Sequence, residues 1–175
     1  LLRPAGVPIP AATTSVIDYR EGRGINPTRM RRYGAHDWRT EPTNLLVISP
    51  TGAGKTYLAC AIGIAACHSQ HEVLYTRMDE LARKLVIARA DGIAHQDFLT
   101  KLSEMDLLII DDFLTVGIDP DAASDLFAIL AGREHRRPTM IASQSGPDYW
   151  AGALPDRVAA DSIVNRLANN ARTIN

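Results

Sequence analysis

The stretch that decides the fold is LLVISPTGAGKTYLACAI, residues 45–62. Its first five residues, 45–49, form an apolar run with the length of a strand that is covered on both faces, because apolar and polar residues barely alternate in it. A turn rich in glycine follows, and a helical pattern begins at Gly54 and opens on Lys55 and Thr56. A strand, a glycine-rich turn and a helix in this order are typical of a loop that binds phosphate.

The residue types in this turn suit the phosphates of a nucleotide. Gly52 and Gly54 allow successive backbone N–H groups to turn inward around a phosphate, where a Cβ atom would obstruct them. The N-terminus of the following helix adds its partial positive charge. Lys55 can neutralise the β and γ phosphates, and the Thr56 hydroxyl can be one oxygen ligand of Mg²⁺. The residues predicted to bind the nucleotide are Pro50, Thr51, Gly52, Ala53, Gly54, Lys55, Thr56 and Tyr57.

Ser49 departs from the strict motif, which has glycine at this position. Pro50 restricts the residue before it to extended backbone conformations, which serine adopts without strain. We therefore expect the loop to bind phosphate without this glycine. An ordinary glycine-rich turn before a helix is the alternative, and the strand and helix on either side of the turn argue against it.

A second apolar run, residues 107–110, ends in two adjacent carboxylates, Asp111 and Asp112. P-loop nucleoside triphosphatases have their magnesium-binding acid at such a strand end. We expect Asp111 to orient the hydration shell of Mg²⁺. Asp112, which would point the other way by strand alternation, could accept a proton from an attacking water. A helix cap or a turn is the structural alternative for this pair.

Ser143 ends another strand-like run and is followed by Gln144. A polar side chain at that place can reach the γ-phosphate or the attacking water, and the same pair is equally typical of a turn. The candidate catalytic residues from these motifs are Lys55, Asp112 and Ser143, and the candidate metal-binding residues are Thr56 and Asp111.

Strand-like runs and helical patterns alternate from residue 44 onward, as expected for repeated βα units around a parallel sheet. Right-handed connections then give a three-layer α/β P-loop fold with helices on both faces of the sheet. Residues 1–43 form a lead-in segment with a short helix over 26–33, and 44–175 form the ATPase core. The chain ends on a further strand-like run, so we expect a piece of a longer protein. The expected strands are 45–49, 73–77, 107–111 and 139–143, the expected helices are 54–68, 79–90, 95–104, 121–135 and 156–170, and the candidate caps are Asp79 and Asp121.

Length and composition limit the remaining possibilities. The 175 residues are 46% hydrophobic and 22% charged, which excludes a collagen, a wholly disordered chain and a disulfide-dense mini-protein. Cys60 and Cys67 would lie about 10 Å apart along one helix, too far to bridge. They indicate a reducing compartment. Because no apolar run of about 20 residues and no signal segment occurs, we expect a cytoplasmic protein without a membrane span.

Several further segments together carry a family resemblance. The sequence resembles the IstB family, which are AAA+ ATPases that assist insertion-sequence transposition and are related to the bacterial helicase loader DnaC. The matching segments are residues 5–8, 17–24, 37–38, the phosphate loop with 58–61, 73–75, 88–92, 107–112, 143–144, 160–163 and 165–167.

The resemblance implies a homo-oligomer whose ATP sites lie between subunits. By this analogy Arg166 is an arginine finger that reaches the γ-phosphate of the neighbouring subunit and completes the catalytic set. Taken alone, Arg166 would be a solvated arginine on a surface helix. Asn165 stands where the family usually has aspartate, and Leu114 stands where it usually has glycine.

Two clusters of basic residues are candidate contacts to DNA. With 19 Lys and Arg against 20 Asp and Glu, the formal net charge of −1 does not itself favour nucleic acid. Local clusters could still neutralise phosphates, and solubility is the alternative role for them. By the family resemblance, the helices between the second and third strands face a DNA channel. The two clusters are Arg83, Lys84, Arg89 and Lys101 in those helices, and Arg20, Arg23, Arg29, Arg31, Arg32 and Arg39 near the start of the chain.

Taken together, the motifs and the resemblance predict a Mg²⁺-dependent ATPase that assembles on duplex DNA and assists a transposase. ATP and Mg²⁺ are the expected cofactors. One alternative is a DnaC-like loader that holds single-stranded DNA and a replicative helicase. Another is a P-loop kinase that phosphorylates a small molecule and works as a monomer.

Overall fold

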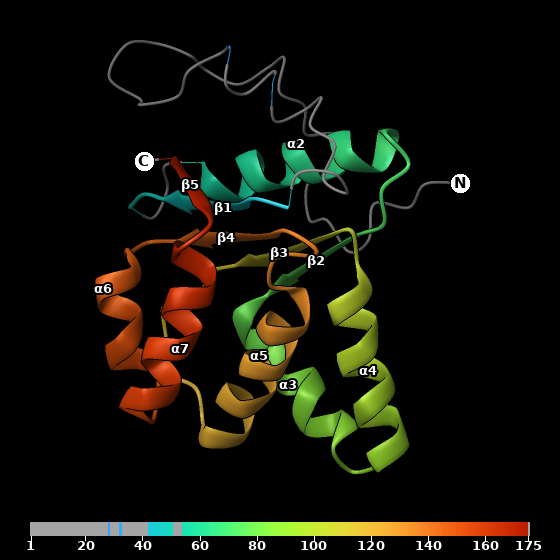
Figure 1. Ribbon diagram of the computed structural model, residues 1–175, viewed down its shortest axis with the longest axis vertical. Helices are drawn as coiled ribbons and strands as arrows, with labels where there is room; N and C mark the ends of the chain where they lie inside the picture. Colours follow the sequence, from blue (N-terminus) through green and yellow to red (C-terminus); the bar gives the residue numbers. More distant parts are fainter. Residues whose placement is uncertain (1–27, 29–31, 33–41, 51–53, 175) are drawn as a thin grey trace.

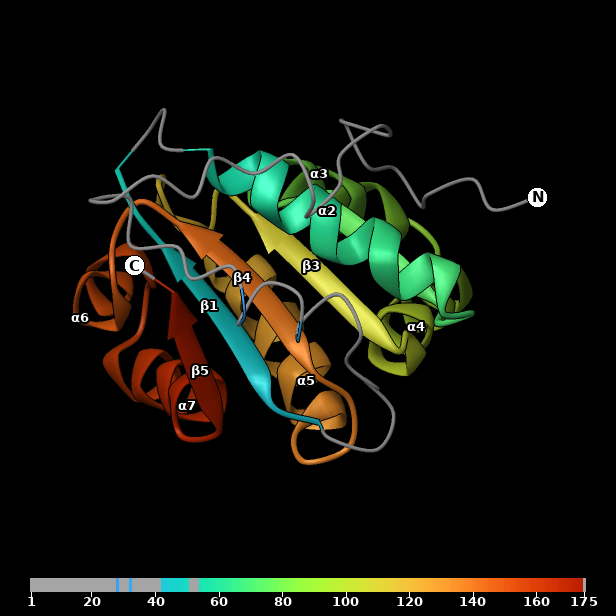
Figure 2. The same ribbon diagram turned by 90° about the horizontal axis from the view of Figure 1, so that it is seen from above.

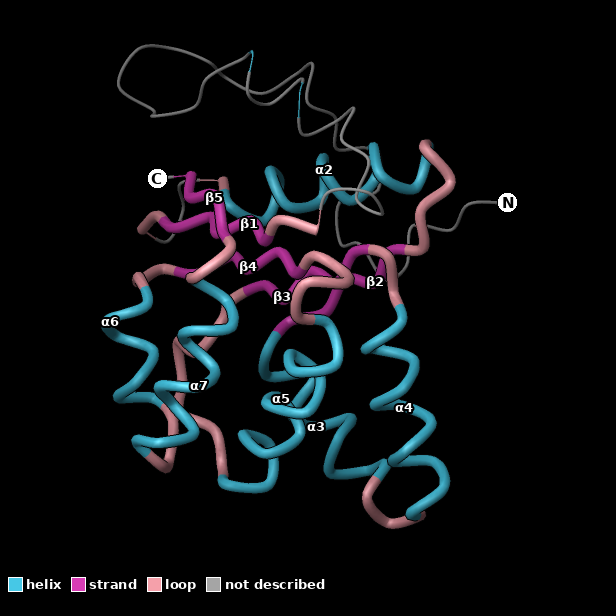
Figure 3. The backbone as a smooth tube through the Cα atoms, viewed as in Figure 1, coloured by secondary structure: helices cyan, strands magenta, loops and turns pink. Residues whose placement is uncertain are grey.

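A parallel sheet is the centre of the computed structural model, which describes residues 28, 32, 42–50 and 54–174. In this part of the chain, five strands lie in the order β2-β3-β4-β1-β5, and every neighbouring pair is parallel. The successive strands are connected through helices (Figure 3). The strands are β1 (Asn44–Ile48), β2 (Val73–Arg77), β3 (Leu107–Asp111), β4 (Thr139–Ser143) and β5 (Ala171–Ile174).

Helices cover both faces of this sheet, so the expected three-layer α/β fold is confirmed. Among the described helices, α2 covers one face and the others lie on the opposite face (Figures 1 and 2). None of the helices within the described ranges is both long and apolar enough to cross a membrane. The helices are α2 (Lys55–His68), α3 (Met78–Ala88), α4 (Gly92–Glu104), α5 (Pro120–Arg133), α6 (Pro147–Trp150), a 3-10 turn (Ala151–Ala153) and α7 (Arg157–Ala168).

Strand β3 shows why this sequence forms a buried parallel sheet. All five of its residues are buried. Leu107 and Ile109 belong to the apolar cluster under α2, whereas Leu108 and Ile110 belong to the cluster on the other face. Since successive side chains of a strand point to opposite faces, a strand covered on both sides must be apolar throughout. Burying each such side chain contributes roughly 1.5–3 kcal/mol.

Helix α4 begins at Gly92, three residues before the expected start at residue 95, and two expected caps are wrong. Asp121 is not a cap, because α5 begins earlier: Pro120 is its first residue, and the Asp119 carboxylate accepts a hydrogen bond from the Ala122 N–H at 2.7 Å. Proline suits this first position because its missing N–H would have no helical partner there. Asp79 is not a cap either, since Arg77 precedes the first turn of α3.

The remaining expectations concern the lead-in segment and the two cysteines. Residues 1–43, with the short helix over 26–33, lie outside the described residues except for Thr28 and Arg32, which are helical, and 42–43. Cys60 and Cys67 are buried and form no disulfide, as expected.

Candidate functional site

The site lies at the edge of the sheet where the parallel strands end. Strand β1 ends there and leads to α2, β3 ends at Asp111, and β2 ends at Arg77 beside it, because Arg77 and Asp111 are register partners. We call this edge the carboxyl edge and the opposite one the amino edge. In open α/β sheets, ligands bind outside the carboxyl ends of the strands.

Only part of the glycine-rich turn falls within the described residues, and Thr51, Gly52 and Ala53 lie outside them. Gly54 precedes α2 with a φ of +86°, and a Cβ atom there would meet nothing within 4 Å. Backbone conformation, not space, therefore requires this glycine. Ser49 has no left-handed backbone, in line with the argument from Pro50.

Lys55 and Thr56 begin α2 and differ in what holds them. The Lys55 Nζ donates an exposed hydrogen bond to the Pro50 carbonyl oxygen at 3.2 Å, so the lysine side chain reaches back to the residue that follows Ser49. The Thr56 hydroxyl donates to Asp111 Oδ2 at 2.8 Å. This bond joins the start of α2 to the end of β3 and brings the two sequence motifs together. Tyr57, the last residue predicted to bind the nucleotide, is partly buried and packs against the core under α2.

Asp111 is buried, and three protein donors hold its carboxylate. Thr56 and the Tyr75 hydroxyl both donate to Oδ2, the latter at 2.5 Å, and the backbone N–H of Asp112 donates to Oδ1 at 2.8 Å. Burial, together with the bond to Asp111, raises the pKa of Tyr75 above its usual range. The phenol therefore remains a donor. Sequence analysis missed Tyr75, which lies 36 positions from its partner.

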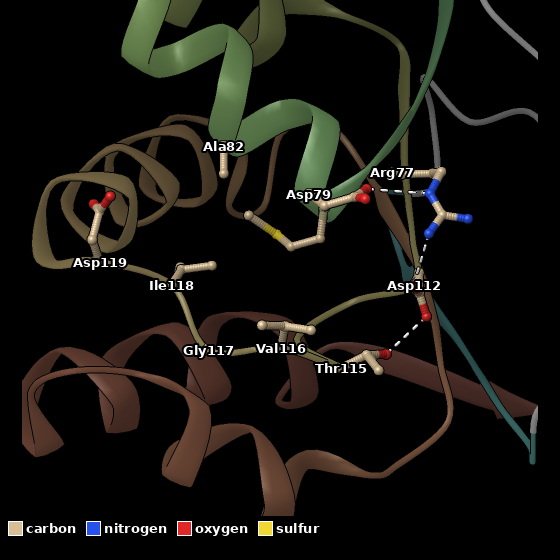
Figure 4. A pocket seen from close by; sticks show the side chains of 10 residues that line it. Arg77, Asp79, Ala82, Asp112, Thr115, Val116, Gly117, Ile118 and Asp119 are labelled. Atoms are coloured by element: carbon tan, nitrogen blue, oxygen red, sulfur yellow. Dashed lines mark hydrogen bonds and ion pairs between the residues drawn. The ribbon is translucent and has the colours of Figure 1, made fainter.

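Asp112 lies beyond the strand end and has a left-handed backbone with φ of +52°. Strand alternation therefore does not set its direction, contrary to the expectation from sequence. Its Oδ2 pairs with Arg77 Nη2 at 3.0 Å, and its Oδ1 accepts from the Thr115 hydroxyl at 2.8 Å (Figure 4). The carboxylate borders a pocket of about 390 Å³ that Val116 and the other residues of Figure 4 line. About a third of the Asp112 side chain is exposed.

Arg77 is the second residue that sequence analysis missed, and it lies between two carboxylates. Besides Asp112 it contacts Asp79, whose Oδ1 is 3.2 Å from Arg77 Nε. The hydrogen bond with Asp79 raises the pKa of Arg77. Partial burial alone would raise the pKa of Asp79, but the hydrogen bonds from Arg77 and from the Glu80 N–H outweigh it and lower that pKa. Both groups stay charged at neutral pH.

Ser143 lies in the interior at the end of β4. Its side chain is fully buried, its hydroxyl donates to the Phe113 carbonyl oxygen at 3.0 Å, and the Trp150 Nε1 donates to it at 3.2 Å. The hydroxyl thus holds the segment after β3 and does not face the surface, which differs from the expected contact with phosphate. The next residue, Gln144, is exposed.

Arg166 lies at the amino edge, away from the other candidate residues. Its carbonyl oxygen accepts a hydrogen bond at 3.2 Å from the side chain of Asn44, the first residue of β1. Its guanidinium pairs with Glu134 and lies 5.0 Å from the centre of the Phe127 ring. A five-residue strand separates the two edges by about 13 Å. In this fold Arg166 cannot complete the site of its own subunit.

The basic cluster between β2 and β3 divides into two kinds of residue. Arg83, Lys84 and Lys101 are exposed. Arg89 instead pairs with the buried Asp125, which also lies 3.0 Å from His95 Nε2. Arg89 therefore ties the α3–α4 hairpin to α5 and is not a free surface cation. Of the second cluster, Arg32 is exposed, and the residues that lie outside the described ranges are Arg20, Arg23, Arg29, Arg31 and Arg39.

The chemistry of Thr56 and Asp111 fits a magnesium ion that arrives with a nucleotide. Both offer oxygen atoms, which this hard cation prefers. Within the described ranges, no group of three His, Cys, Asp or Glu side chains could hold a metal ion by itself. The phosphates and water would therefore have to complete the coordination shell.

Comparisons with known proteins agree with this geometry. The family model of the IstB-like ATP binding protein matches residues 1–175. The putative insertion sequence ATP-binding proteins y4uH and y4pL of Sinorhizobium fredii are 38% and 36% identical over 173 and 158 residues. These matches cover 99% and 90% of this chain. They cover 69% and 64% of the relatives, so the chain spans about two thirds of their length.

Solved structures show the same fold. The DnaI structure superposes with a TM-score of 0.78 at 23% identity and covers 95% of this chain and 88% of DnaI. The DnaC helicase loader superposes with a TM-score of 0.77 at 16% identity, over 93% of this chain and 95% of the loader. The fold is thus the P-loop core of AAA+ proteins. Because a family model matches the whole sequence and its two phosphate-site motifs meet in space, this chain belongs to the IstB-like ATP binding protein family.

Proposed function

We propose that this protein binds and hydrolyses Mg²⁺-ATP, assembles on duplex DNA and assists a transposase of an insertion sequence. One observation supports the ATPase part above all others, the 2.8 Å hydrogen bond between the Thr56 hydroxyl and Asp111. This bond joins Thr56, a residue of the predicted phosphate loop, to the first of the two acids at the end of β3. P-loop ATPases hold magnesium between these two positions.

The residues at the carboxyl edge have separate roles in this proposal. Lys55 leaves the Pro50 carbonyl, to which it is bonded at 3.2 Å, and neutralises the β and γ phosphates. Thr56 would bind Mg²⁺ and Asp111 would orient its hydration shell, and the bound ion would supply positive charge to the phosphates. A water oxygen attacks the γ-phosphorus, the bond to the β–γ bridging oxygen breaks, and Asp112 accepts the proton of the water. Ser143 supports the segment that carries Asp112 by its hydrogen bond to the Phe113 carbonyl oxygen. The next residue, Gln144, is exposed and takes the place of Ser143 as the polar group that can meet a phosphate.

The position of Arg166 supports assembly into an oligomer. Its guanidinium lies at the amino edge, and its own carboxyl edge is about 13 Å away. If Arg166 stabilises the charge that develops on the γ-phosphate, it must do so in a neighbouring subunit. The guanidinium is also incompletely satisfied, because its Nε is buried and has no hydrogen-bond partner in the described structure.

The proposal for DNA and a transposase rests on the relatives, whose names refer to insertion sequences. The exposed Arg83, Lys84 and Lys101 on α3 and α4 are the described cations that could contact phosphates. A helicase loader is the second candidate, because the fold likeness covers 95% of the DnaC loader. Membership in the family leaves a small-molecule kinase without support.

Two variants test the ATPase. Lys55→Ala should lower ATP affinity by about 100-fold, because one charge-assisted contact to phosphate is lost. It should not unfold the protein, because Lys55 is only partly buried and its hydrogen bond to Pro50 is exposed. Asp112→Asn should bind ATP but hydrolyse it about 100-fold more slowly or worse. Asp97→Asn on the exposed surface of α4 is the matched control. Full hydrolysis by Asp112→Asn would refute the role of this acid.

A DNA comparison separates the two candidate functions. The full chain is measured with duplex and with single-stranded DNA of the same length, with ATP and without nucleotide. We expect binding that requires ATP and prefers the duplex. A preference for single strands would favour the helicase loader. Imaging of the same samples shows whether the subunits form rings or spirals.

A further inference from the structure

Tyr75 is a buried side chain that points at the magnesium acid from a neighbouring strand. It lies in β2, its register partner in β3 is Ile109, and its side chain is 7% exposed. Its hydroxyl donates to Asp111 Oδ2 at 2.5 Å. The ring packs in the apolar cluster under α2. Neither the phosphate motif nor the acid pair assigns this residue a role.

The donors around Asp111 leave only part of its carboxylate available. A carboxylate offers about four lone-pair sites, two on each oxygen. Thr56 and Tyr75 both donate to Oδ2, and the Asp112 N–H donates to Oδ1. Oδ2 therefore has no acceptor site left, whereas Oδ1 keeps one. Which oxygen keeps the free acceptor site depends on how the carboxylate is rotated about the Cβ–Cγ bond of Asp111.

Tyr75 is better suited than Thr56 to fix this orientation. Thr56 belongs to the start of α2 and must also offer a lone pair to the metal, so its position depends on the nucleotide. The Tyr75 ring is held in the core and has only two rotatable bonds between the backbone and the ring. A hydroxyl anchored in this way defines one point in space that Oδ2 must meet.

We propose that Tyr75 is a positioning residue that fixes Asp111 so that Oδ1 alone accepts a hydrogen bond from a water on Mg²⁺. Asp111 then acts on the metal through water and does not bind it directly. This inference rests on the proposed Mg²⁺-ATP site and deepens it. Replacing a residue that hydrogen-bonds to a metal ligand typically changes the metal affinity by about 10–100-fold.

The experiment compares Tyr75→Phe with the wild-type full chain. Phenylalanine keeps the buried ring and removes only the donor. ATP binding is measured in EDTA and during a Mg²⁺ titration. We expect Tyr75→Phe to need about tenfold more Mg²⁺ for half-maximal tightening of ATP binding, with unchanged ATP affinity in EDTA. Tyr149→Phe, at a tyrosine that is 74% exposed, is the matched control.

A double variant tests whether Tyr75 acts through Asp111. Asp111→Asn alone should already weaken the response to Mg²⁺, and adding Tyr75→Phe should weaken it no further. The inference would be overturned if the losses of the two single variants added up in the double variant, or if Tyr75→Phe responded to Mg²⁺ like the wild type. It would also be overturned if Tyr75→Phe lost as much ATP affinity in EDTA as it does with Mg²⁺. If the wild-type chain binds no ATP with or without Mg²⁺, the proposed ATPase function itself fails. If the wild type binds Mg²⁺-ATP but Tyr75→Phe behaves like it, only the role of Tyr75 fails.

Discussion

The carboxyl and amino edges of the sheet each hold an arginine next to a carboxylate, but the two pairs have different surroundings. At the carboxyl edge, Arg77 and Asp112 border an open pocket, and the arginine also contacts Asp79. At the amino edge, Arg166 pairs with Glu134 beside Phe127, far from any group that could react with a nucleotide in the same subunit. The first pair includes the candidate base, Asp112, and the second holds an arginine about 13 Å from the carboxyl edge of its own sheet.

The amino edge also shows what a structural arginine looks like. Arg133 is 1% exposed, and its guanidinium donates to the carbonyl oxygens of Leu102, Met105 and Pro138 and to the Thr139 hydroxyl. Burial lowers the pKa of Arg133. These donors close the end of α4 and the turn before β4. Arg166, by contrast, is about a third exposed and leaves one nitrogen without a partner. The comparison therefore separates a fully buried arginine, whose donors close the fold, from one that is partly exposed and held mainly by one carboxylate.

The largest expected effect is on Arg166. Arg166→Ala should slow ATP hydrolysis by about 1,000-fold, as for arginine fingers supplied in trans, while ATP affinity per subunit stays nearly unchanged. Hydrolysis and nucleotide binding are measured on the same preparation, with the exposed Arg136→Ala as control. Mixing Arg166→Ala with Lys55→Ala subunits should restore part of the activity, because each supplies what the other lacks. A wild-type rate of hydrolysis for Arg166→Ala would show that the arginine at the amino edge has no role in the reaction.

Arg133 should show the opposite behaviour, with a large loss of stability. Arg133→Met leaves several buried carbonyl oxygens without a donor, so the free energy of unfolding should fall by about 3 kcal/mol. Arg166→Met should lower it by less than about 1 kcal/mol, because that ion pair is partly exposed. Urea unfolding of both variants checks the comparison. Equal losses would mean that Arg166 is as structural as Arg133.

Arg77 should have a smaller effect on rate. If the ion pair restrains Asp112, Arg77→Met should raise the DNA-independent rate of hydrolysis by up to about fivefold, since an exposed pair contributes at most about 1 kcal/mol. Arg77→Lys should stay close to the wild type. A slower Arg77→Met enzyme would instead show that Arg77 assists the reaction.

Leu114 tests the backbone of the carboxyl edge and has the smallest expected effect. It is 4% exposed and has a left-handed φ of +52°, which favours glycine. Both Leu114→Ala and Leu114→Gly lose buried apolar surface. Leu114→Gly should nevertheless be more stable than Leu114→Ala by about 1 kcal/mol, because only glycine adopts this conformation without strain. The reverse order in urea unfolding would contradict the strain.

Local patterns in the sequence predicted most of the fold. The four expected strands lie within one residue of β1, β2, β3 and β4, because a strand covered on both faces requires an unbroken apolar run. Helix starts were less accurate. The candidate caps of α5, Asp119 and Asp121, are only two positions apart. Which of them caps the helix depends on which carboxylate meets a free backbone N–H.

The sequence by itself predicted the phosphate loop and the acid pair, because each lies within a few consecutive residues. It also predicted the family, because the matching segments can be recognised along the chain without knowing how they meet in space. The tertiary structure alone decided that Tyr75 meets Asp111, that Arg77 meets Asp112, that Ser143 faces inward and that Arg166 lies at the opposite edge. These contacts join residues about 30 or more positions apart or depend on which face of a strand is covered. Strand order and register fix them, and neither is visible in a local pattern.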